Sequence, residues 1–139
     1  EAVSIATTKV PNGSQKVSAE REVAQADLAR ARALVESARA YLEHALSTAV
    51  AVAERGEPLD RDLKVSLQLA CCTAAESGAA AADLAYRAVG TDGFLERHGI
   101  ERHVRDAHVL MQHGTKSFPK YVSAGKVIVG LPSDAPMLN

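Results

Sequence analysis

Apolar residues recur at alternating steps of three and four between Ser18 and Arg55, the spacing that keeps side chains on one stripe of a helix. The stripe consists of Leu28, Ala31, Val35, Ala38, Leu42, Ala45, Ala49 and Val52. Ser18 is placed to cap the start of this helix, and Gly56 and Pro58 are placed to end it. The pattern therefore predicts one long amphipathic helix over residues 18–55.

A second stripe with the same spacing lies between Asp60 and Gly90. Its members are Leu63, Leu67, Ala70, Ala74, Ser77, Ala81, Leu84 and Ala88. Asp60 can cap the N-terminus of this helix, and Gly90 can end it. Since both stripes consist largely of small residues, we expect two long antiparallel helices whose backbones approach each other closely.

Shorter elements follow the second long helix. The sequence "GTDG" at residues 90–93 opens a loop, and Arg102–His113 has the spacing of a third amphipathic helix. Ser117 as a cap and Pro119 in the first turn favour a last helix that runs through Val129. The pattern as a whole predicts an all-α, up-and-down four-helix bundle.

The two ends of the chain differ from this bundle. "EAVSIATTK" has the character of the end of a helix and "VPNGSQ" that of a loop, so residues 1–17 are assigned to the end of a preceding helix and a connection. The bundle then occupies residues 18–131, and residues 132–139 form an irregular tail. We hypothesise that the chain is a piece of a longer protein.

Composition limits the classes of function. The 139 residues carry 16 basic and 17 acidic side chains and a net charge of -1, which leaves no basic surface for nucleic acid or for an anionic membrane. Charges interrupt every apolar stretch before it reaches the roughly 20 residues that a membrane span needs. The N-terminus also lacks the pattern of a signal peptide. We therefore expect a cytoplasmic protein of one domain.

The residues that can bind metals are poorly arranged for doing so. Cys71 and Cys72 are adjacent on a helix, where they cannot form an ordinary disulfide, so both are expected to be reduced. Four histidines recur every five residues, which turns successive side chains by about 140° and does not bring them to one ion. These are His98, His103, His108 and His113. No metal site is predicted, and His44 is expected to be a solvated position on the first long helix.

Arg105 and Asp106 stand next to each other in the third helix and point apart. Each is expected to pair with another element, as a buried polar contact that fixes the orientation of the helix. Only His108 or His113 then remains as a candidate for chemistry in this stretch.

The order of these features resembles a known family. "ARALVESARAYLEHA", "LAYRAVGTDG", "IERHVRDAHVLMQH" and "AGKVIVGLP" together look like the C-terminal helical domain of the acyl-CoA dehydrogenase superfamily, over roughly residues 18–131. They are particularly similar to the branch that contains flavin-dependent two-component monooxygenases. The resemblance implies a flavin oxidoreductase that forms a dimer or tetramer and binds FAD, or alternatively FMN, between subunits.

The resemblance also implies roles for individual residues. Arg87, Gly90 and Thr91 match positions where dehydrogenases have a glutamine and two glycines that contact the adenine-diphosphate portion of the flavin of a neighbouring subunit. His113 stands in "HGT" where dehydrogenases commonly have "EGT", whose glutamate removes a proton from the thioester substrate. Because histidine can donate or accept a proton near neutral pH, His113 is the candidate catalytic residue.

Three functions are weighed from the sequence. The first is a domain of a flavin enzyme that oxidises an acyl-CoA, and the second is a monooxygenase of the same superfamily that acts on an aromatic or polycyclic substrate, with a flavin reductase as a possible partner. The third is a non-catalytic helical interaction module. We expect the chain by itself to self-associate, to lack flavin and to show little or no activity.

Overall fold

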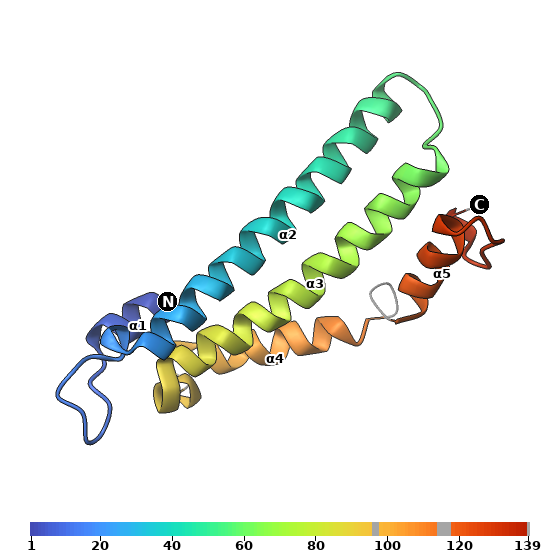
Figure 1. The fold of residues 1–139 in the computed structure, drawn as a ribbon. Helices are drawn as coiled ribbons and strands as arrows, with labels where there is room; N and C mark the ends of the chain where they lie inside the picture. Colours follow the sequence, from blue (N-terminus) through green and yellow to red (C-terminus); the bar gives the residue numbers. More distant parts are fainter. Residues whose placement is uncertain (96–97, 114–117, 139) are drawn as a thin grey trace.

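A computed structural model describes residues 1–95, 98–113 and 118–138. Its helices are α1 (Ala2–Thr8), α2 (Glu22–Glu54), α3 (Arg61–Val89), α4 (Ile100–Met111) and α5 (Phe118–Ile128) (Figure 1). Short 3-10 turns form η1 (Ser18–Glu20), η2 (Gly90–Phe94) and η5 (Pro136–Leu138). No β-strand occurs in the described ranges, and the predicted all-α class is confirmed.

Helices α2 and α3 form a long antiparallel pair that lies side by side in Figure 1. The buried face of α2 carries alanines one heptad apart, at Ala24, Ala31, Ala38 and Ala45. Helix α3 in turn buries Ala70, Ala81 and Ala88, among others. A heptad of small residues lets two helices pack closely at a shallow crossing angle, so the predicted close approach has a direct structural basis. We call this alanine-lined contact the α2–α3 seam.

Helices α4 and α5 cover α3 in succession. Ile100 at the start of α4 packs with Val89 at the end of α3, whereas Val127 of α5 packs with Val65 near the start of α3. The two helices therefore run in the same direction, antiparallel to α3, and each covers one half of it (Figure 1). Helix α3 is the element against which α1, α2, α4 and α5 all pack.

The predicted ends of the long helices are mostly correct. The Asp60 carboxylate accepts a hydrogen bond from the Leu63 backbone N–H at 2.7 Å, which confirms the predicted cap of α3. Gly90 follows the last residue of α3, as predicted. Ser18 does not cap α2: it is buried in the separate turn η1, and α2 begins at Glu22 after Arg21, which makes no side-chain cap.

Three further expectations need adjustment. The "GTDG" segment forms the turn η2 rather than an open loop, and α4 begins at Ile100, two residues earlier than expected. The tail is not wholly irregular, because η5 folds back so that Leu138 is 1% exposed within the core beside α3 and α5. The free energy gained by burying the Leu138 side chain stabilises the folded position of the tail. The predicted cap at Ser117 lies outside the described residues.

Candidate functional site

A polar cleft of about 610 Å³ lies where the loop after α1 meets the end of α3. Gly90 and Thr91, two of the residues predicted to contact a flavin, line this cleft together. The remaining lining residues are Lys9, Val10, Pro11, Asn12, Ser18, Arg21, Val89 and Asp92. The cleft therefore joins two segments that are far apart in the sequence and mixes backbone groups with charges of both signs.

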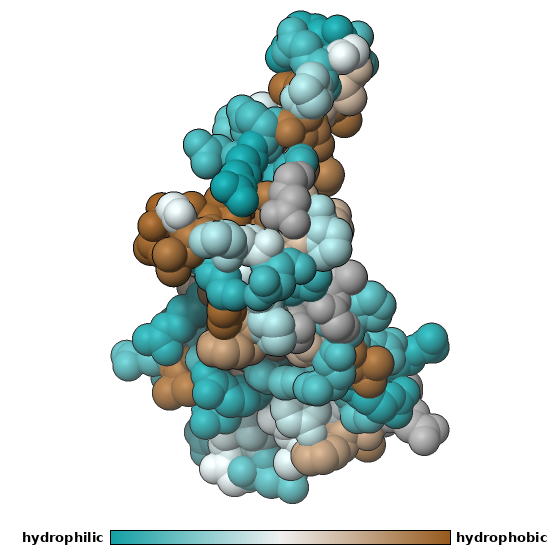
Figure 2. Space-filling view, turned by 90° about the vertical axis from the view of Figure 1, so that its right-hand side faces the viewer, coloured by the Kyte–Doolittle hydropathy of each residue, from teal (hydrophilic) through white to brown (hydrophobic). Residues whose placement is uncertain are grey.

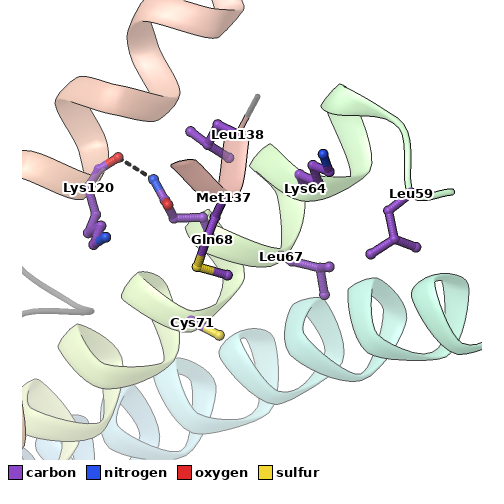
Figure 3. Close-up of a pocket in the computed structure, with 8 residues that line it drawn as sticks. All are labelled: Leu59, Lys64, Leu67, Gln68, Cys71, Lys120, Met137 and Leu138. Atoms are coloured by element: carbon purple, nitrogen blue, oxygen red, sulfur yellow. Dashed lines mark hydrogen bonds between the residues drawn. The ribbon is translucent and has the colours of Figure 1, made fainter. Parts of the chain in front are cut away.

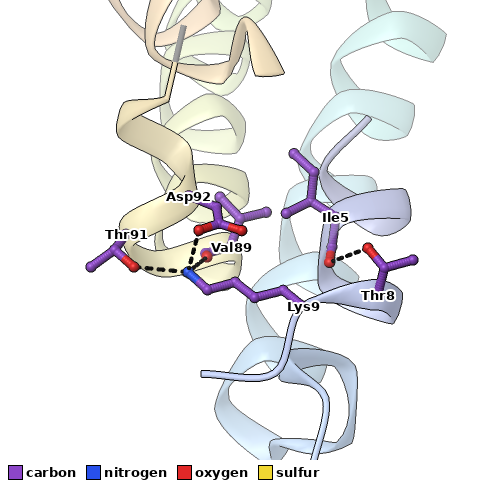
Figure 4. A network of polar contacts seen from close by, with 6 residues as sticks. All are labelled: Ile5, Thr8, Lys9, Val89, Thr91 and Asp92. Atoms are coloured by element: carbon purple, nitrogen blue, oxygen red, sulfur yellow. Dashed lines mark hydrogen bonds and ion pairs between the residues drawn. The ribbon is translucent and has the colours of Figure 1, made fainter. Parts of the chain in front are cut away.

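Lys9 lines this cleft and lies at the centre of a network of polar contacts (Figure 4). Its ammonium nitrogen donates hydrogen bonds to the Val89 carbonyl at 3.0 Å and to the Thr91 hydroxyl at 2.9 Å. The same nitrogen lies 3.1 Å from the Asp92 carboxylate, and the Lys9 side chain is 12% exposed. Three oxygen partners match the three donors of an ammonium group, so Lys9 serves to hold the end of α3 rather than to present a cation to the cleft.

Gly90 supplies the change of direction at the end of α3. Its φ of +61° belongs to the left-handed region that favours glycine, and its N–H donates to the carbonyls of Tyr86 and Arg87. Gly90 is exposed, and Thr91 directly follows it at the mouth of the cleft. Thr91 accepts a hydrogen bond from Lys9, which leaves its own O–H to donate to a ligand oxygen.

Arg87 lies one turn before Gly90 and does not line the cleft. Its Nη2 donates to Oδ1 of Asp27 at 2.9 Å. The Asp27 side chain is 5% exposed within the α2–α3 seam, whereas the Arg87 side chain is 62% exposed. The structure thus gives the predicted arginine a buried partner on α2.

Asp27 is a residue that the sequence pattern could have revealed. It stands three residues after Ala24 and four before Ala31, which are both buried in the α2–α3 seam. A carboxylate in this register is unusual, because a buried charge is strongly unfavourable without a partner. The apolar stripe predicted from the sequence starts at Leu28, one residue after Asp27, so Asp27 was not among the predicted buried positions.

His113 lies at the other end of α4, far from the cleft. It follows Met111 and Gln112, is exposed, and its backbone N–H donates to the Leu110 carbonyl at 3.1 Å. Helix α4 is about 18 Å long for its twelve residues and starts beside the end of α3. The structure therefore does not bring His113 together with Gly90 and Thr91 within this chain. The rest of the "HGT" motif lies outside the described residues.

The other charged residues of α4 mostly form local contacts. Arg105 pairs with Glu101 at 3.2 Å and Asp106 with Arg102 at 3.5 Å, each one turn away on the same exposed helix face. The expectation that Arg105 and Asp106 form buried pairs with other elements is therefore wrong. Residues one turn apart on a helix are close neighbours, and long side chains reach each other without leaving water.

His44 is exposed on α2, as predicted. His103 is also exposed and lies 3.4 Å from Glu1, while His108 contacts Asp83 of α3 at 2.9 Å. Neither Cys71 nor Cys72 forms a disulfide. Within residues 1–95, 98–113 and 118–138, no three His, Cys, Asp or Glu side chains gather as metal ligands.

None of the described helices combines the length and apolar character that a membrane span requires.

A polar contact joins the middle of α3 to the first turn of α5. Burial raises the pKa of the Tyr121 phenol to about 12, and a hydrogen bond to Glu76 together with the negative charge of Glu76 adds to the rise. A hydrogen bond to Thr73 acts in the opposite direction. Tyr121 therefore stays protonated over the whole ordinary pH range and can donate to the Glu76 carboxylate.

A second, apolar cavity of about 380 Å³ lies between α3 and the C-terminal tail (Figure 3). Its walls are the side chains of Leu59, Lys64, Leu67, Gln68, Cys71, Lys120, Met137 and Leu138. The Gln68 amide donates to the Lys120 carbonyl at 2.6 Å, and Arg61 Nε donates to the Leu138 carbonyl at 3.1 Å. These two hydrogen bonds tie α5 and the tail to α3.

The helical fold agrees with the comparison to known families. The chain belongs to the acyl-CoA dehydrogenase C-terminal domain family, whose model matches residues 1–118. A relative, the indole-3-acetate monooxygenase of Pseudomonas putida, is 32% identical over 112 residues. This alignment covers 81% of the chain and 29% of the relative, so the chain spans less than a third of that protein's length. The matched range contains α1 to α4 and therefore all the predicted site residues.

Proposed function

We propose that this chain serves as the C-terminal domain of a flavin-dependent oxidoreductase, in which it contributes to flavin binding and to subunit assembly. The observation that carries the proposal is the family match over residues 1–118. The matched relative is an enzyme much longer than this chain, which supports a role as one part of a larger catalyst. We expect the chain alone to be inactive, because a single helical domain offers only part of a flavin site.

The residues at the end of α3 have a chemistry that fits the diphosphate of FAD. Arg87 offers an exposed guanidinium, Thr91 offers a hydroxyl proton, and Gly90 offers backbone without a Cβ. In this proposal the three residues hold the adenine-diphosphate portion of a flavin, and FAD is preferred over FMN because FMN lacks that portion. The bound flavin would supply the electron-accepting group of the reaction.

A second candidate function is a monooxygenase of the same superfamily. The observation that favours it is that the relative from Pseudomonas putida is named a monooxygenase. The resemblance adds that His113, in "HGT", takes the place of the glutamate in the "EGT" of acyl-CoA dehydrogenases. In this alternative His113 moves a proton at the substrate or near the site of oxygen chemistry, which histidine can do near neutral pH. The substrate would be aromatic or polycyclic instead of an acyl-CoA, and a flavin reductase would be a partner.

Exposed apolar side chains support the role in assembly. Figure 2 views the side of the molecule on which α5 lies and shows apolar residues, in brown, among the polar ones. Phe118 and Val122 lie one turn apart on α5 and are 78% and 42% exposed, and Val129, directly after the last residue of α5, is 69% exposed. A stripe of this kind fits contact with a further subunit in a dimer or tetramer. If the domain acted alone as an interaction module, this surface would be the one it uses.

The experiment that tests the proposed function uses the full-length protein with bound flavin. Medium-chain and long-chain acyl-CoA are added without oxygen, and the visible flavin absorption is followed. Bleaching supports acyl-CoA oxidation. No bleaching, followed by hydroxylation of an aromatic substrate when the chemically reduced protein meets oxygen, supports the monooxygenase. A full-length protein that binds no flavin would overturn both.

The role of His113 is tested by the pH dependence of whichever activity is found. In the variant His113→Gln we expect the shape of the pH profile to change and the rate to fall by about 10²–10⁴-fold, as for loss of a general acid or base. His44→Gln is the matched control, since His44 is exposed on the outside of α2. Equal pH profiles for the wild type and His113→Gln would exclude His113 from proton transfer.

A further inference from the structure

Asp27 places a carboxylate where the helix pair is otherwise lined by alanine. Its side chain is 5% exposed, and Ala24 and Ala31 flank it on the buried face of α2. A buried ion pair adds little net stability, because removing both charges from water is costly. The position would be filled more favourably by an apolar side chain if packing were its only task. Asp27 therefore calls for a second explanation.

The pair that Asp27 forms is strongly asymmetric. Arg87 donates from Nη2 to Oδ1 of Asp27 at 2.9 Å, yet the Arg87 side chain is 62% exposed. A guanidinium carries five N–H donors in a rigid planar fork, and only one edge faces the carboxylate. The buried acid thus holds one N–H of an arginine whose side chain is largely exposed. This is the arrangement that prepares a guanidinium for an anion arriving from solution.

Arg87 lies one helical turn before the residues that line the polar cleft, although its own side chain does not line it. The Gly90 N–H donates to the Arg87 carbonyl, so the arginine stands one turn from the cleft that Gly90 and Thr91 line. We propose that Asp27 is a positioning residue that holds the Arg87 guanidinium for the diphosphate of FAD. This inference rests on the proposed function. It adds a residue on α2 that touches no ligand and acts through Arg87.

The inference makes a prediction that depends on the type of flavin. The second phosphate and the adenosine distinguish FAD from FMN, so a residue that acts on this portion changes the affinity for FAD and leaves that for FMN alone. A bidentate contact between guanidinium and phosphate needs both groups held in one plane, and an arginine released from Asp27 loses that geometry. The preference for FAD over FMN is therefore the readout, and a purely structural role would not change it.

The test measures dissociation constants for FAD and FMN with the full-length protein, using the quenching of flavin fluorescence. The variants are Asp27→Asn, Arg87→Met and the double variant Asp27→Leu with Arg87→Met. The double variant removes both charged partners together, which preserves the seam better than leaving one of them unpaired. Glu36→Gln is the matched control, because Glu36 pairs with Arg32 on the exposed face of the same helix. Melting temperatures of the apoproteins report folding separately.

We expect Asp27→Asn and Arg87→Met each to weaken FAD binding by about tenfold and to change FMN binding by less than about twofold. The double variant should bind FAD no more weakly than Arg87→Met while it regains melting temperature relative to Asp27→Asn. A variant Asp27→Asn that melts earlier but keeps the wild-type preference for FAD would reduce Asp27 to a structural role. An unchanged FAD affinity in Arg87→Met would overturn the inference while the proposed function stands, whereas a wild type that binds neither flavin would overturn both.

Discussion

Lys9 reaches from the end of α1 to Asp92 in η2, where its ammonium nitrogen lies 3.1 Å from the carboxylate. The same nitrogen holds the last carbonyl of α3, at Val89, and the Thr91 hydroxyl. One side chain therefore joins the first helix to the turn that ends the third. It also fixes the two residues, Gly90 and Thr91, that line the polar cleft.

Replacing Lys9 by methionine should loosen this end of the molecule. Methionine keeps the apolar stem but removes the three donors, so the free energy of unfolding is expected to fall by about 2 kcal/mol. Urea unfolding followed by circular dichroism measures the change. The exposed Lys16→Met, in the loop after α1, serves as the control and should change stability by less than about 0.5 kcal/mol. Equal losses in the two variants would contradict the role assigned to Lys9.

Two glycines are expected to respond in opposite ways to alanine. At Gly93 an added Cβ would lie 2.9 Å from two ring carbons of Tyr86, closer than real contacts allow, and 3.2 Å from Val89, which is a tight contact. Gly93→Ala should therefore destabilise the fold by about 1–3 kcal/mol through overpacking. At Gly78, within α3, an added Cβ meets nothing within 4 Å, so Gly78→Ala should stabilise the helix by about 0.5–1 kcal/mol. Thermal unfolding of both variants tests the pair, and a stable Gly93→Ala would show that Tyr86 can move aside.

The raised pKa of Tyr121 predicts a loss of stability at high pH. The protonated phenol is the form that the fold favours, and its pKa is about 12 instead of the usual 10.0. The contribution of this group is therefore complete below pH 10 and is lost as the pH rises through about 12. In the tyrosinate absorbance, the transition near pH 12 should disappear in Tyr121→Phe and persist in Tyr41→Phe. A late transition that persists in Tyr121→Phe would assign it to another tyrosine.

The exposed stripe of α5 predicts the site of self-association. Val122 lies between Phe118 and Val129 along the chain, so Val122→Glu would place a charge in the middle of a contact. We expect the association constant to fall by about tenfold or more, as measured by sedimentation over a range of concentrations. Val23→Glu is a matched change at an exposed valine of α2 and should leave association unaltered. If Val23→Glu has the larger effect, the contact lies on α2 instead.

The long helices could be predicted because their signals are local. Alternating steps of three and four defined both stripes, and the cap at Asp60 and the glycine at position 90 depend only on neighbouring residues. Of the first stripe, Val35 proved to be 40% exposed, since one stripe on a helix is wider than the contact that a single partner makes. The prediction of Ser18 as a cap failed because the buried turn η1 separates it from α2.

The relationships that form the site were not local and were therefore missed. Asp27 and Arg87 belong to different helices, and only their packing in the seam makes them partners. Lys9 likewise acts on residues at the far end of α3, and nothing in the loop sequence indicates that reach. Gly90 and Thr91 were identified by resemblance, which finds positions but not their neighbours. The burial of Leu138 depends on tertiary contacts with α3 and α5 in the same way.

The alanines of the α2–α3 seam also make the helix pair a mechanical element. Ala38 is buried at the middle of α2, which has 33 residues and packs against the 29 residues of α3. A leucine at this position would push the two helices apart. Because long helices are stiff, a small tilt between α2 and α3 at their middle would become a larger displacement near their ends, where Asp27 meets Arg87. Natural variation at Ala31, Ala38 and Ala45 should therefore be confined to glycine, alanine and serine, even though these residues lie far from any ligand.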